Sequence, residues 1–341
     1  MIDPKVSGNL SRMAFGHATS QIIYAAVRLG VPEALADGPL ATGELARAVD
    51  CDPDGLTRLV RALTVLGLLD EAAPGRFALA EPGRLLCAGH PRSIRASVLL
   101  LGDPVTWRAW GALTEGVRTG GAAFDQAHGR PLFDHLADDP ELSGLFNAAM
   151  GEGTGWTARE VPRAYDFTGA RTVVDIGGGN GTLLAAVLRS APDARGVLFD
   201  SAQGSAAAAE TFRAAGLAPD RWSIEAGDFF QAVPRGDVLL VKGILHDWDD
   251  ERCAALLRNC RTAIAPDGRL LVVEPVLPDR LDAQEAAGVV MSDIAMLVYT
   301  GGRERSRAEF RALLADGGFR LLDVTRRLAT TPVRILVAAP D

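Results

Sequence analysis

The stretch from Val173 to Thr182 reads as a buried β-strand, a glycine-rich turn and the start of a helix. Glycine at 177, 179 and 181 lets the backbone approach a ligand, although a glycine-rich turn can also be merely tight. Dinucleotide enzymes use a similar corner, but a G-x-G-x-x-G pattern from Gly177 requires glycine at 182, where this chain has Thr182. The corner therefore predicts a nucleotide-type ligand at Gly177, Gly179 and Gly181, without the full dinucleotide fingerprint.

Acidic residues follow the next two predicted strands, at the same edge of a parallel sheet. Asp200 ends the run that begins at Val197, where its carboxylate can accept hydrogen bonds from both hydroxyls of a ribose. Its alternative role is the N-cap of a helix expected over residues 201–215. After the third strand, Asp228 suits a hydrogen bond from an adenine amine, and the ring of Phe229 suits covering an adenine face.

His246 comes shortly after the fourth predicted strand, whose last residue is followed by Lys242. At this edge of the sheet an imidazole can reach a second substrate, although a buried structural histidine is the alternative. The acidic run of Asp249, Asp250 and Glu251 invites a metal-site interpretation. These residue types also begin helices, both as caps and through the helix dipole, so we expect a helix start here and no metal.

The sequence pattern after residue 170 predicts the strands and helices that must position these residues. Short β-branched runs alternate with Ala- and Leu-rich helical stretches, which is typical of parallel strands joined by crossover helices. The expected strands are Thr172–Ile176, Gly196–Phe199, Trp222–Glu225, Val238–Val241 and Leu270–Glu274. Residues 320–325 and 333–338 should pair antiparallel at the sheet edge, because their connection is too short for a helix. The prediction is an α/β fold with a doubly wound, mostly parallel, seven-stranded sheet.

Residues 1–100 read as helices followed by a small hairpin, the pattern of a winged helix. Winged helices often bind DNA, but the would-be recognition helix over residues 55–63 offers only Arg58 and Arg61 among leucines and valines. A dimerisation domain is therefore favoured over a DNA-binding regulator. Residues 101–165 are expected to form an aromatic-rich helical connector that contributes to a substrate pocket, and residues 166–341 the catalytic domain.

The charge balance narrows the classes of partner. The 341 residues hold 35 Lys and Arg against 43 Asp and Glu, a formal net charge of −8. This charge disfavours nucleic acid and anionic membranes as partners. Apolar runs are too short to span a bilayer, the opening residues lack a secretory pattern, and the four cysteines form no C-x-x-C pair. The sequence predicts a cytoplasmic protein without structural disulfides or zinc.

Several sequence motifs occur in an order that resembles that of a known enzyme family. They are VDIGGGNG at 174–181, FD at 199–200, GDFF at 227–230, LHDWDDE at 245–251, VEPVLP at 273–278 and GGRER at 301–305. With them the chain resembles the caffeic-acid-type O-methyltransferases, in particular the bacterial branch that tailors polyketide and other aromatic natural products, antibiotics among them. The resemblance covers nearly the whole chain. It implies a class I methyltransferase fold, S-adenosylmethionine as cofactor and a homodimer formed through the N-terminal domain.

The resemblance also implies a role for each matching residue. The loop from Gly177 to Gly181 would hold the methionine part of S-adenosylmethionine and Lys242 its methionine end, whereas Asp200 would bind the ribose. The adenine would lie against Asp228 and Phe229. His246 would be the general base, flanked and oriented by Glu274 and Glu304 and followed by Asp247. Met150, in the motif Phe-Asn-x-x-Met, would line the acceptor pocket.

The expected reaction is methylation of a hydroxyl, in the simplest case a phenol, on a small aromatic or polyketide-type acceptor. A phenol with a pKa of about 10 must lose its proton as it attacks, and a histidine supported by a carboxylate can take it without a metal. The helix expected over 289–299 offers Met291, Asp293 and Met296 as hypothetical acceptor contacts, with core packing as the alternative. Because fold does not fix chemistry, decarboxylation, hydroxylation and N- or C-methylation are the alternative reactions.

Overall fold

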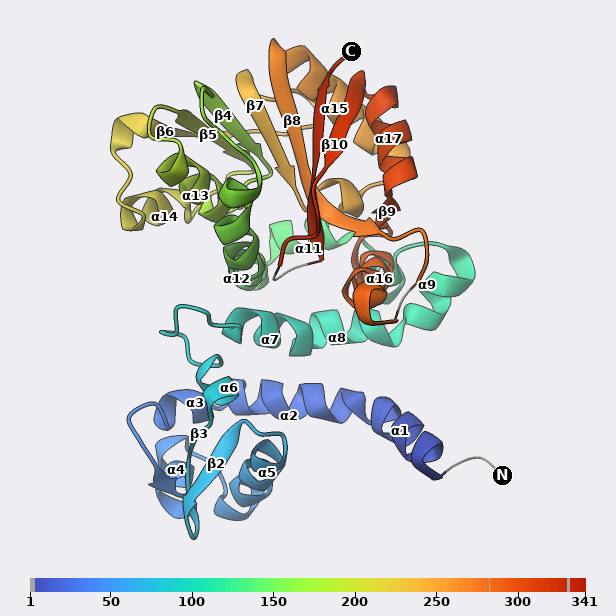
Figure 1. Ribbon diagram of the computed structural model, residues 1–341. Coiled ribbons are helices and arrows are strands. Elements are labelled where there is room, and N and C mark those ends of the chain that lie inside the picture. Colours follow the sequence, from blue (N-terminus) through green and yellow to red (C-terminus); the bar gives the residue numbers. More distant parts are fainter. Residues whose placement is uncertain (1–3, 282, 330–331) are drawn as a thin grey trace. The chain divides into compact units, whose positions relative to one another are not determined.

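A computed structural model describes residues 4–281, 283–329 and 332–341, and the chain divides into two compact units between Trp107 and Arg108. The helices of the first unit are α1 (Pro4–Ala14), α2 (Gly16–Arg28), α3 (Val31–Ala34), α4 (Thr42–Ala48), α5 (Pro53–Val65), α6 (Glu81–Arg84) and α7 (Arg95–Gly102). Its strands β1 (Leu40–Ala41), β2 (Leu69–Ala73) and β3 (Arg76–Leu79) form an antiparallel sheet in the order β1-β3-β2. Helices followed by this small sheet confirm the predicted winged helix (Figure 1).

Helix α5 shows why the sequence of the first unit folds as it does. Asp52 caps the helix by accepting a hydrogen bond from the Gly55 amide at 2.7 Å, and Pro53 occupies the first helical position. Leu56, Val60 and Leu63, spaced by four and three residues, are buried in the core of the unit. Arg58 and Arg61 lie exposed on the opposite side of the same helix.

The second unit contains the helices of the connector and the helices around a large sheet. They are α9 (Leu113–Thr119), α10 (Ala123–His128), α11 (Leu132–Asp138), α12 (Pro140–Ala164), α13 (Thr182–Ser190), α14 (Ala208–Ala214), α15 (Asp250–Ala263), α16 (Ala283–Tyr299) and α17 (Arg307–Asp316), with short 3₁₀ turns at Pro219–Arg221 and Leu245–Asp247. Helix α8 (Pro104–Gly111) crosses the boundary between the units. The run of helices from α8 to α12 agrees with the helical character expected for residues 101–165. The contribution of this connector to a substrate pocket stays a prediction.

The large sheet has the predicted doubly wound, mostly parallel architecture. Its strands are β4 (Thr172–Ile176), β5 (Arg195–Asp200), β6 (Trp222–Ala226), β7 (Gly236–Lys242), β8 (Ile264–Leu277), β10 (Phe319–Val324) and β11 (Val333–Pro340). Seven strands follow the order β10-β11-β8-β7-β4-β5-β6, and the two-residue β9 (Arg305–Ser306) adds to β8. As expected, β10 and β11 pair antiparallel at the edge of the sheet.

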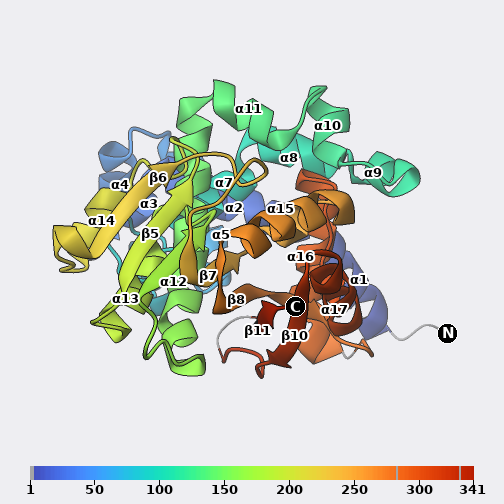
Figure 2. The ribbon, with the colours of Figure 1, turned by 90° about the horizontal axis from the view of Figure 1, so that it is seen from above.

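Two hydrophobic cores lie on opposite faces of this sheet, because successive residues of a strand point in opposite directions. Val173 of β4 belongs to the core formed with α12, α13 and α14, whereas Val174 belongs to the core formed with α15 and α17. The two helical layers can be followed in Figure 2. Among the described residues, no helix is both long and apolar enough to cross a membrane.

The helix expected over residues 201–215 is wrong in its first half, because α14 begins only at Ala208. The Asp200 carboxylate accepts a hydrogen bond from the Ser201 amide at 2.6 Å, and the Ser201 hydroxyl accepts one from the Gly204 amide at 3.0 Å. Such local bonds compete with helix formation, and glycine further weakens it. Asp200 is therefore not the N-cap of α14.

Candidate active site

The chemistry-bearing residues meet at one edge of the large sheet because their strands are parallel. Ile176 of β4 lies beside Phe199 of β5 on one side and beside Val241 of β7 on the other. The glycine-rich loop, Asp200 and Lys242 each follow or end one of these strands. Their convergence at the carboxyl end of the sheet is the usual location of ligands in this architecture.

The glycine-rich loop needs its glycines for close packing. At Gly177, with a φ of 68°, an added Cβ atom would collide with the Ile244 side chain. At Gly181, with a φ of 78°, it would lie 2.8 Å from the ring of Phe212. The loop is tied to the next strand, because the Gly179 amide donates a hydrogen bond to Asp200 Oδ2 at 2.8 Å.

Asp200 is the acid at the centre of this edge. Burial raises its pKa, and the hydrogen bonds from the Gly179 and Ser201 amides oppose that rise. Gly204 lies so close that an added Cβ atom would collide with the carboxylate. A carboxylate has about four lone-pair positions. The Gly179 amide and the amide and hydroxyl of Ser201 occupy three of them, so Asp200 can accept about one further hydrogen bond, from a ribose hydroxyl.

Asp228 and Phe229 follow β6, as expected. Asp228 is exposed and accepts a hydrogen bond from the Phe230 amide at 2.8 Å. The ring of Phe229 contacts Phe230 edge to face at 4.7 Å between centroids, and Trp248 at 6.5 Å. These neighbours hold the Phe229 ring in place, as a surface for stacking a base requires.

Lys242 and Asp175 lie close enough to influence each other's ionisation, and sequence reasoning had singled out only Lys242. Lys242 Nζ donates a hydrogen bond to Thr154 Oγ1 on α12 at 3.0 Å, and burial lowers the pKa of this lysine. Burial raises the pKa of Asp175 to about 7 although the charge of Lys242 opposes it. Asp175 Oδ2 is buried and accepts no hydrogen bond within the described part of the chain. This orphaned oxygen is the kind of group that a cationic ligand satisfies.

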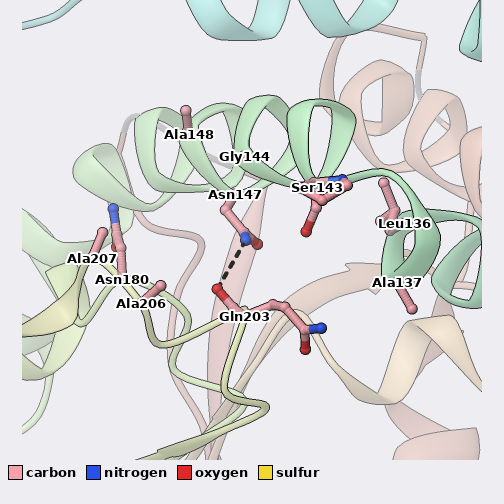
Figure 3. A pocket seen from close by; sticks show the side chains of 12 residues that line it. Leu136, Ala137, Ser143, Gly144, Asn147, Ala148, Asn180, Gln203, Ala206 and Ala207 are labelled. Carbon is pink, nitrogen blue, oxygen red and sulfur yellow. Dashed lines mark hydrogen bonds between the residues drawn. The ribbon is translucent and has the colours of Figure 1, made fainter.

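One face of α12 closes over this edge of the sheet. Asn147 donates a hydrogen bond to the backbone oxygen of Gln203 at 3.4 Å, as Figure 3 shows. One turn later, Gly151 lies so close to the Asn180 side chain that an added Cβ atom would collide with it. A further turn brings Thr154 to Lys242. Residues 147, 151 and 154 are spaced as one helix face, which sequence reasoning could have found from the 3.6-residue period.

A pocket of about 440 Å³ adjoins the same face of α12. Most of its walls are small or neutral polar residues, among them Ser143, Asn147, Asn180 and Gln203 (Figure 3), together with Gly204. Asn180 belongs to the glycine-rich loop and Gly204 contacts Asp200, so the pocket opens beside the expected cofactor residues.

His246 is held by a chain of hydrogen bonds. Its Nδ1 lies 3.0 Å from Glu304 Oε1, and the same oxygen accepts a hydrogen bond from the Ser292 hydroxyl at 2.7 Å. Asp293 Oδ1 accepts a hydrogen bond from the Glu304 amide at 2.8 Å. The Nε2 atom faces the end of β7, where an added Cβ atom at Gly243 would lie 3.6 Å away. Glu304 is completely buried, whereas 16% of the His246 side chain is exposed.

Carboxylates dominate the electrostatics around His246. Burial by itself would lower the pKa of the imidazole, but Glu274, Asp247 and Glu304 outweigh it and raise the pKa to about 10. Burial also raises the pKa of Glu274, and that of Asp247 to about 6. Glu274 Oε1 accepts hydrogen bonds from the Ile244 and Leu245 amides at 2.9 and 2.6 Å. The backbone before the histidine is thereby tied to β8.

The same three side chains have the spacing of a cation site. One possible ligand atom each from His246, Glu274 and Glu304 lies within 4.8 Å of the others. One oxygen of each glutamate, Oε2, is buried and accepts no hydrogen bond in the described residues. A shared proton or a cation would each satisfy these oxygens.

The acidic run at 249–251 begins a helix, as predicted. Asp249 caps α15 by accepting a hydrogen bond from the Arg252 amide at 2.8 Å, and Asp250 and Glu251 occupy the first turn. Asp250 also forms ion pairs with Arg303 at 2.7 Å and Arg305 at 2.8 Å. The arginines of the GGRER motif were not singled out by sequence reasoning.

The four residues expected to contact an acceptor lie in different surroundings. Met150 and Met291 are 46% and 61% exposed, and Met296 is half-buried. Asp293 holds the backbone of Glu304, which is a positioning contact. Their contact with an acceptor stays a prediction. Aromatic side chains form a cluster in which the Phe133 ring contacts both Phe146 and Trp248.

The residues at this edge fit S-adenosylmethionine. The loop has no room for side chains at Gly177 and Gly181, Asp200 has a lone pair for a ribose hydroxyl, and Phe229 offers a ring for an adenine. The orphaned oxygen of Asp175 and the net negative cluster around His246 suit a ligand with an ammonium and a sulfonium group.

Comparison with known proteins agrees with this geometry. The family model of the O-methyltransferase domain matches residues 110–320, and that of the O-methyltransferase dimerisation domain matches residues 11–89. The O-demethylpuromycin-O-methyltransferase of Streptomyces alboniger is 44% identical over 96% of this chain and 88% of its own length. The crystal structure of LaPhzM superposes with a TM-score of 0.93 at 38% identity, over 98% of this chain and 99% of that one.

A further relative has a different named reaction. The 8-amino-8-demethylriboflavin N,N-dimethyltransferase of Streptomyces davaonensis is 38% identical over 89% of this chain and 87% of its own length. Both family models and the relatives lead to one conclusion, which the geometry of the sheet edge supports. The chain belongs to the S-adenosylmethionine-dependent O-methyltransferase family, with a class I methyltransferase domain and an N-terminal dimerisation domain.

Proposed function

We propose that this protein transfers a methyl group from S-adenosylmethionine to a phenolic hydroxyl of a small aromatic natural product, with His246 as general base. The observation that carries the proposal is the hydrogen bond between His246 Nδ1 and Glu304 Oε1 at 3.0 Å. It leaves Nε2, on the side of Gly243 and the ligand-binding edge, to accept the proton of the acceptor. S-adenosylmethionine supplies a methyl group on a cationic sulfonium.

The electrostatics suit a phenol. The pKa of a phenol is about 10, and Glu274, Asp247 and Glu304 outweigh the effect of burial to raise that of His246 to about 10 as well. Proton transfer between two groups of similar pKa is close to thermoneutral, which favours general base catalysis. A positive charge bound beside the carboxylate cluster lowers the pKa of His246, so that more of the imidazole is neutral when the cofactor is present.

The cofactor residues proposed from the motifs are Gly177, Gly179, Gly181, Asp200, Asp228, Phe229 and Lys242. Their convergence at one edge of the sheet supports this set. Thr154, Asn147 and Asp175 join it because α12 closes over that edge and Asp175 has an orphaned oxygen. Binding the reactants in this closed site aligns donor and acceptor, which can contribute roughly 7 to 11 kcal/mol to lowering the barrier in well-oriented reactions.

The test is turnover by a His246→Ala variant. We expect the variant to lose about 100- to 10,000-fold in kcat, the range typical of general base catalysis. Its dissociation constant for S-adenosylhomocysteine, measured by calorimetry, should stay within a factor of two. Full activity in the variant would refute the assignment of the base.

We propose that the reaction needs no divalent metal, although His246, Glu274 and Glu304 have the spacing of a cation site. The hydrogen bond of His246 Nδ1 to Glu304 supports a proton-transfer role for this cluster. Activity should persist after dialysis against EDTA, and added Mg²⁺ or Zn²⁺ should not increase it. Activity lost with EDTA and restored by one of these ions would contradict the proposal.

The N,N-dimethyltransferase among the relatives gives the alternative chemistry a specific form, namely methylation of an aromatic amine. An amine attacks without a base as strong as that needed by a phenol, whereas this chain retains His246 with Glu304 beside it. Fragment masses of the product decide between a methyl group on oxygen and one on nitrogen. Loss of carbon dioxide or gain of oxygen would indicate decarboxylation or hydroxylation.

We propose that the protein is a homodimer, as the match to the O-methyltransferase dimerisation domain supports. Leu10, Met13 and Phe15, in and just after α1, are 68%, 77% and 68% exposed in the single chain. Apolar side chains gathered on one exposed segment favour burial against a second chain. A cytoplasmic location and the absence of nucleic-acid binding stay predictions, and a mobility-shift assay at low salt tests the latter.

A further inference from the structure

Arg305 is the largest side chain that is fully buried in the described part of the protein. Its guanidinium donates hydrogen bonds to the backbone oxygens of Leu245 and Trp248, each at 2.8 Å. It also donates twice to Asp250 Oδ1, from Nε at 3.0 Å and from Nη2 at 2.8 Å. A buried charge is costly unless it is paired, and the partners of this arginine are the Asp250 carboxylate and the two backbone oxygens.

The two carbonyl groups that Arg305 binds belong to the residues immediately before and two positions after His246. Between them the chain forms a short 3₁₀ turn, Leu245–Asp247, which has few hydrogen bonds of its own. Arg305 therefore fixes both ends of the turn that carries the imidazole. The planar guanidinium presents its donors in a rigid fork, so the separation of the two carbonyl groups is set by one side chain.

The backbone of Arg305 is itself anchored. In β9 it lies beside Val276 of β8, two residues after Glu274. The preceding residue, Glu304, holds His246 Nδ1, and an added Cβ atom at Gly302 would collide with the backbone oxygen of His246. The segment 302–305 thus contacts the histidine turn through its backbone, a carboxylate and a guanidinium.

We propose that Arg305 is a positioning residue for methyl transfer, which sets the distance from His246 to the acceptor hydroxyl by holding the turn of residues 245–248. The proposal rests on His246 being the base. Arg305 acts through His246, because the hydrogen bonds of its guanidinium go to the turn, to Asp250 and to the Cys253 sulfur.

Arg305→Lys is the informative change, because lysine keeps the charge but cannot bind two carbonyl groups and a carboxylate in one plane. Misplacement of a catalytic group by about 1 Å can cost about 100-fold in rate, so we expect kcat to fall about 100-fold. The KM for S-adenosylmethionine should stay within a factor of two, because the cofactor residues do not contact Arg305.

Arg221 provides a matched control. Its guanidinium also donates to three backbone oxygens, those of Leu188, Ala191 and Ala194. These lie at the end of α13 and before β5, at the amino end of a parallel strand, whereas His246 follows the carboxyl end of β7. Arg221→Lys should lower the melting temperature without lowering kcat.

A double-mutant cycle separates positioning from general destabilisation. In a His246→Ala background, Arg305→Lys should change the residual rate by less than a factor of three, because the group that it positions is gone. An equal loss in both backgrounds, or full activity of the single variant, would overturn the proposal. Full activity of His246→Ala alone would instead refute the proposed base.

Asp250→Asn keeps the proposal testable if Arg305→Lys does not fold. The Asp250 side chain is 57% exposed, so its replacement removes the charged partner of Arg305 at small risk to the core. We expect kcat to fall about tenfold, with an unchanged KM for the cofactor and the same loss of effect in the His246→Ala background. An unchanged kcat in Asp250→Asn would contradict the anchoring role.

Discussion

Replacing Glu304 by glutamine should move the pH dependence of methyl transfer to lower pH. The Glu304 carboxylate lies 3.0 Å from His246 Nδ1 and is completely buried. Glutamine has the same shape and its amide oxygen can still accept the Nδ1 proton, so the substitution removes charge and leaves the geometry in place.

The size of the shift follows from Coulomb's law. Two unit charges about 4 Å apart interact by about 4 kcal/mol at an effective dielectric constant of about 20, which equals about three pH units. Glu274 and Asp247 remain in the variant and keep part of the effect, so we expect a shift of about one to three units, roughly a third to all of that value. With the carboxylates outweighing burial, the pKa of His246 in the native protein is raised to about 10.

The raised pKa of His246 determines how both activity and stability depend on pH. The neutral imidazole is the base, so activity rises with pH toward the pKa of His246, and in Glu304→Gln it should level off at lower pH. The folded-state pKa of His246 lies above the unfolded value of about 6.5. Its stabilising contribution is therefore complete below about pH 6.5 and is lost as pH rises toward 10, and the variant should lose most stability at the acidic end.

The assay is kcat/KM for the acceptor at saturating S-adenosylmethionine, from about pH 6 to about pH 10.5. Glu251→Gln is the control, because it removes the same charge from an exposed position in the first turn of α15. The reasoning would be refuted by a profile for Glu304→Gln that coincides with that of the control, or by one displaced to higher pH.

Three further predictions concern the cofactor and the dimer. Asp200→Asn should weaken S-adenosylhomocysteine binding about 10- to 100-fold in calorimetry, because hydrogen bonds to a charged group are worth about 1.5–3 kcal/mol each; unchanged affinity would remove Asp200 from the ribose site. Gly153→Ala, which meets no atom within 4 Å, should stabilise α12 by about 0.5–1 kcal/mol, whereas Gly151→Ala pushes on Asn180 and should weaken cofactor binding. Equal melting temperatures and affinities for the two variants would contradict this. Phe15→Asp should shift the protein toward the monomer in light scattering, whereas Leu322→Asp, at an exposed position of β10, should not.

The fold was accessible from the sequence because local patterns report which face of an element is buried. A short β-branched run predicted β4, whose Val173 and Val174 the structure places in two different cores, and the short link before Val333 correctly predicted an antiparallel edge. The prediction failed over residues 201–207, where Ser201 and Gly204 form side-chain-to-backbone bonds that an Ala-rich composition conceals.

Some residues of the candidate site could likewise be identified from the sequence, and others only from the structure. The sequence by itself determined that the glycine loop, Asp200 and His246 each follow a parallel strand, and parallel strands bring such positions to one edge. Glu274 and Glu304 came from the family resemblance. Only the tertiary structure decided that Ser292 and Asp293 hold Glu304, that Thr154 reaches Lys242, and that Arg305 binds the histidine turn. These contacts join residues up to 88 positions apart in the chain. They depend on how α12 and α16 pack in the second unit and on how β9 pairs with β8, which no local periodicity encodes.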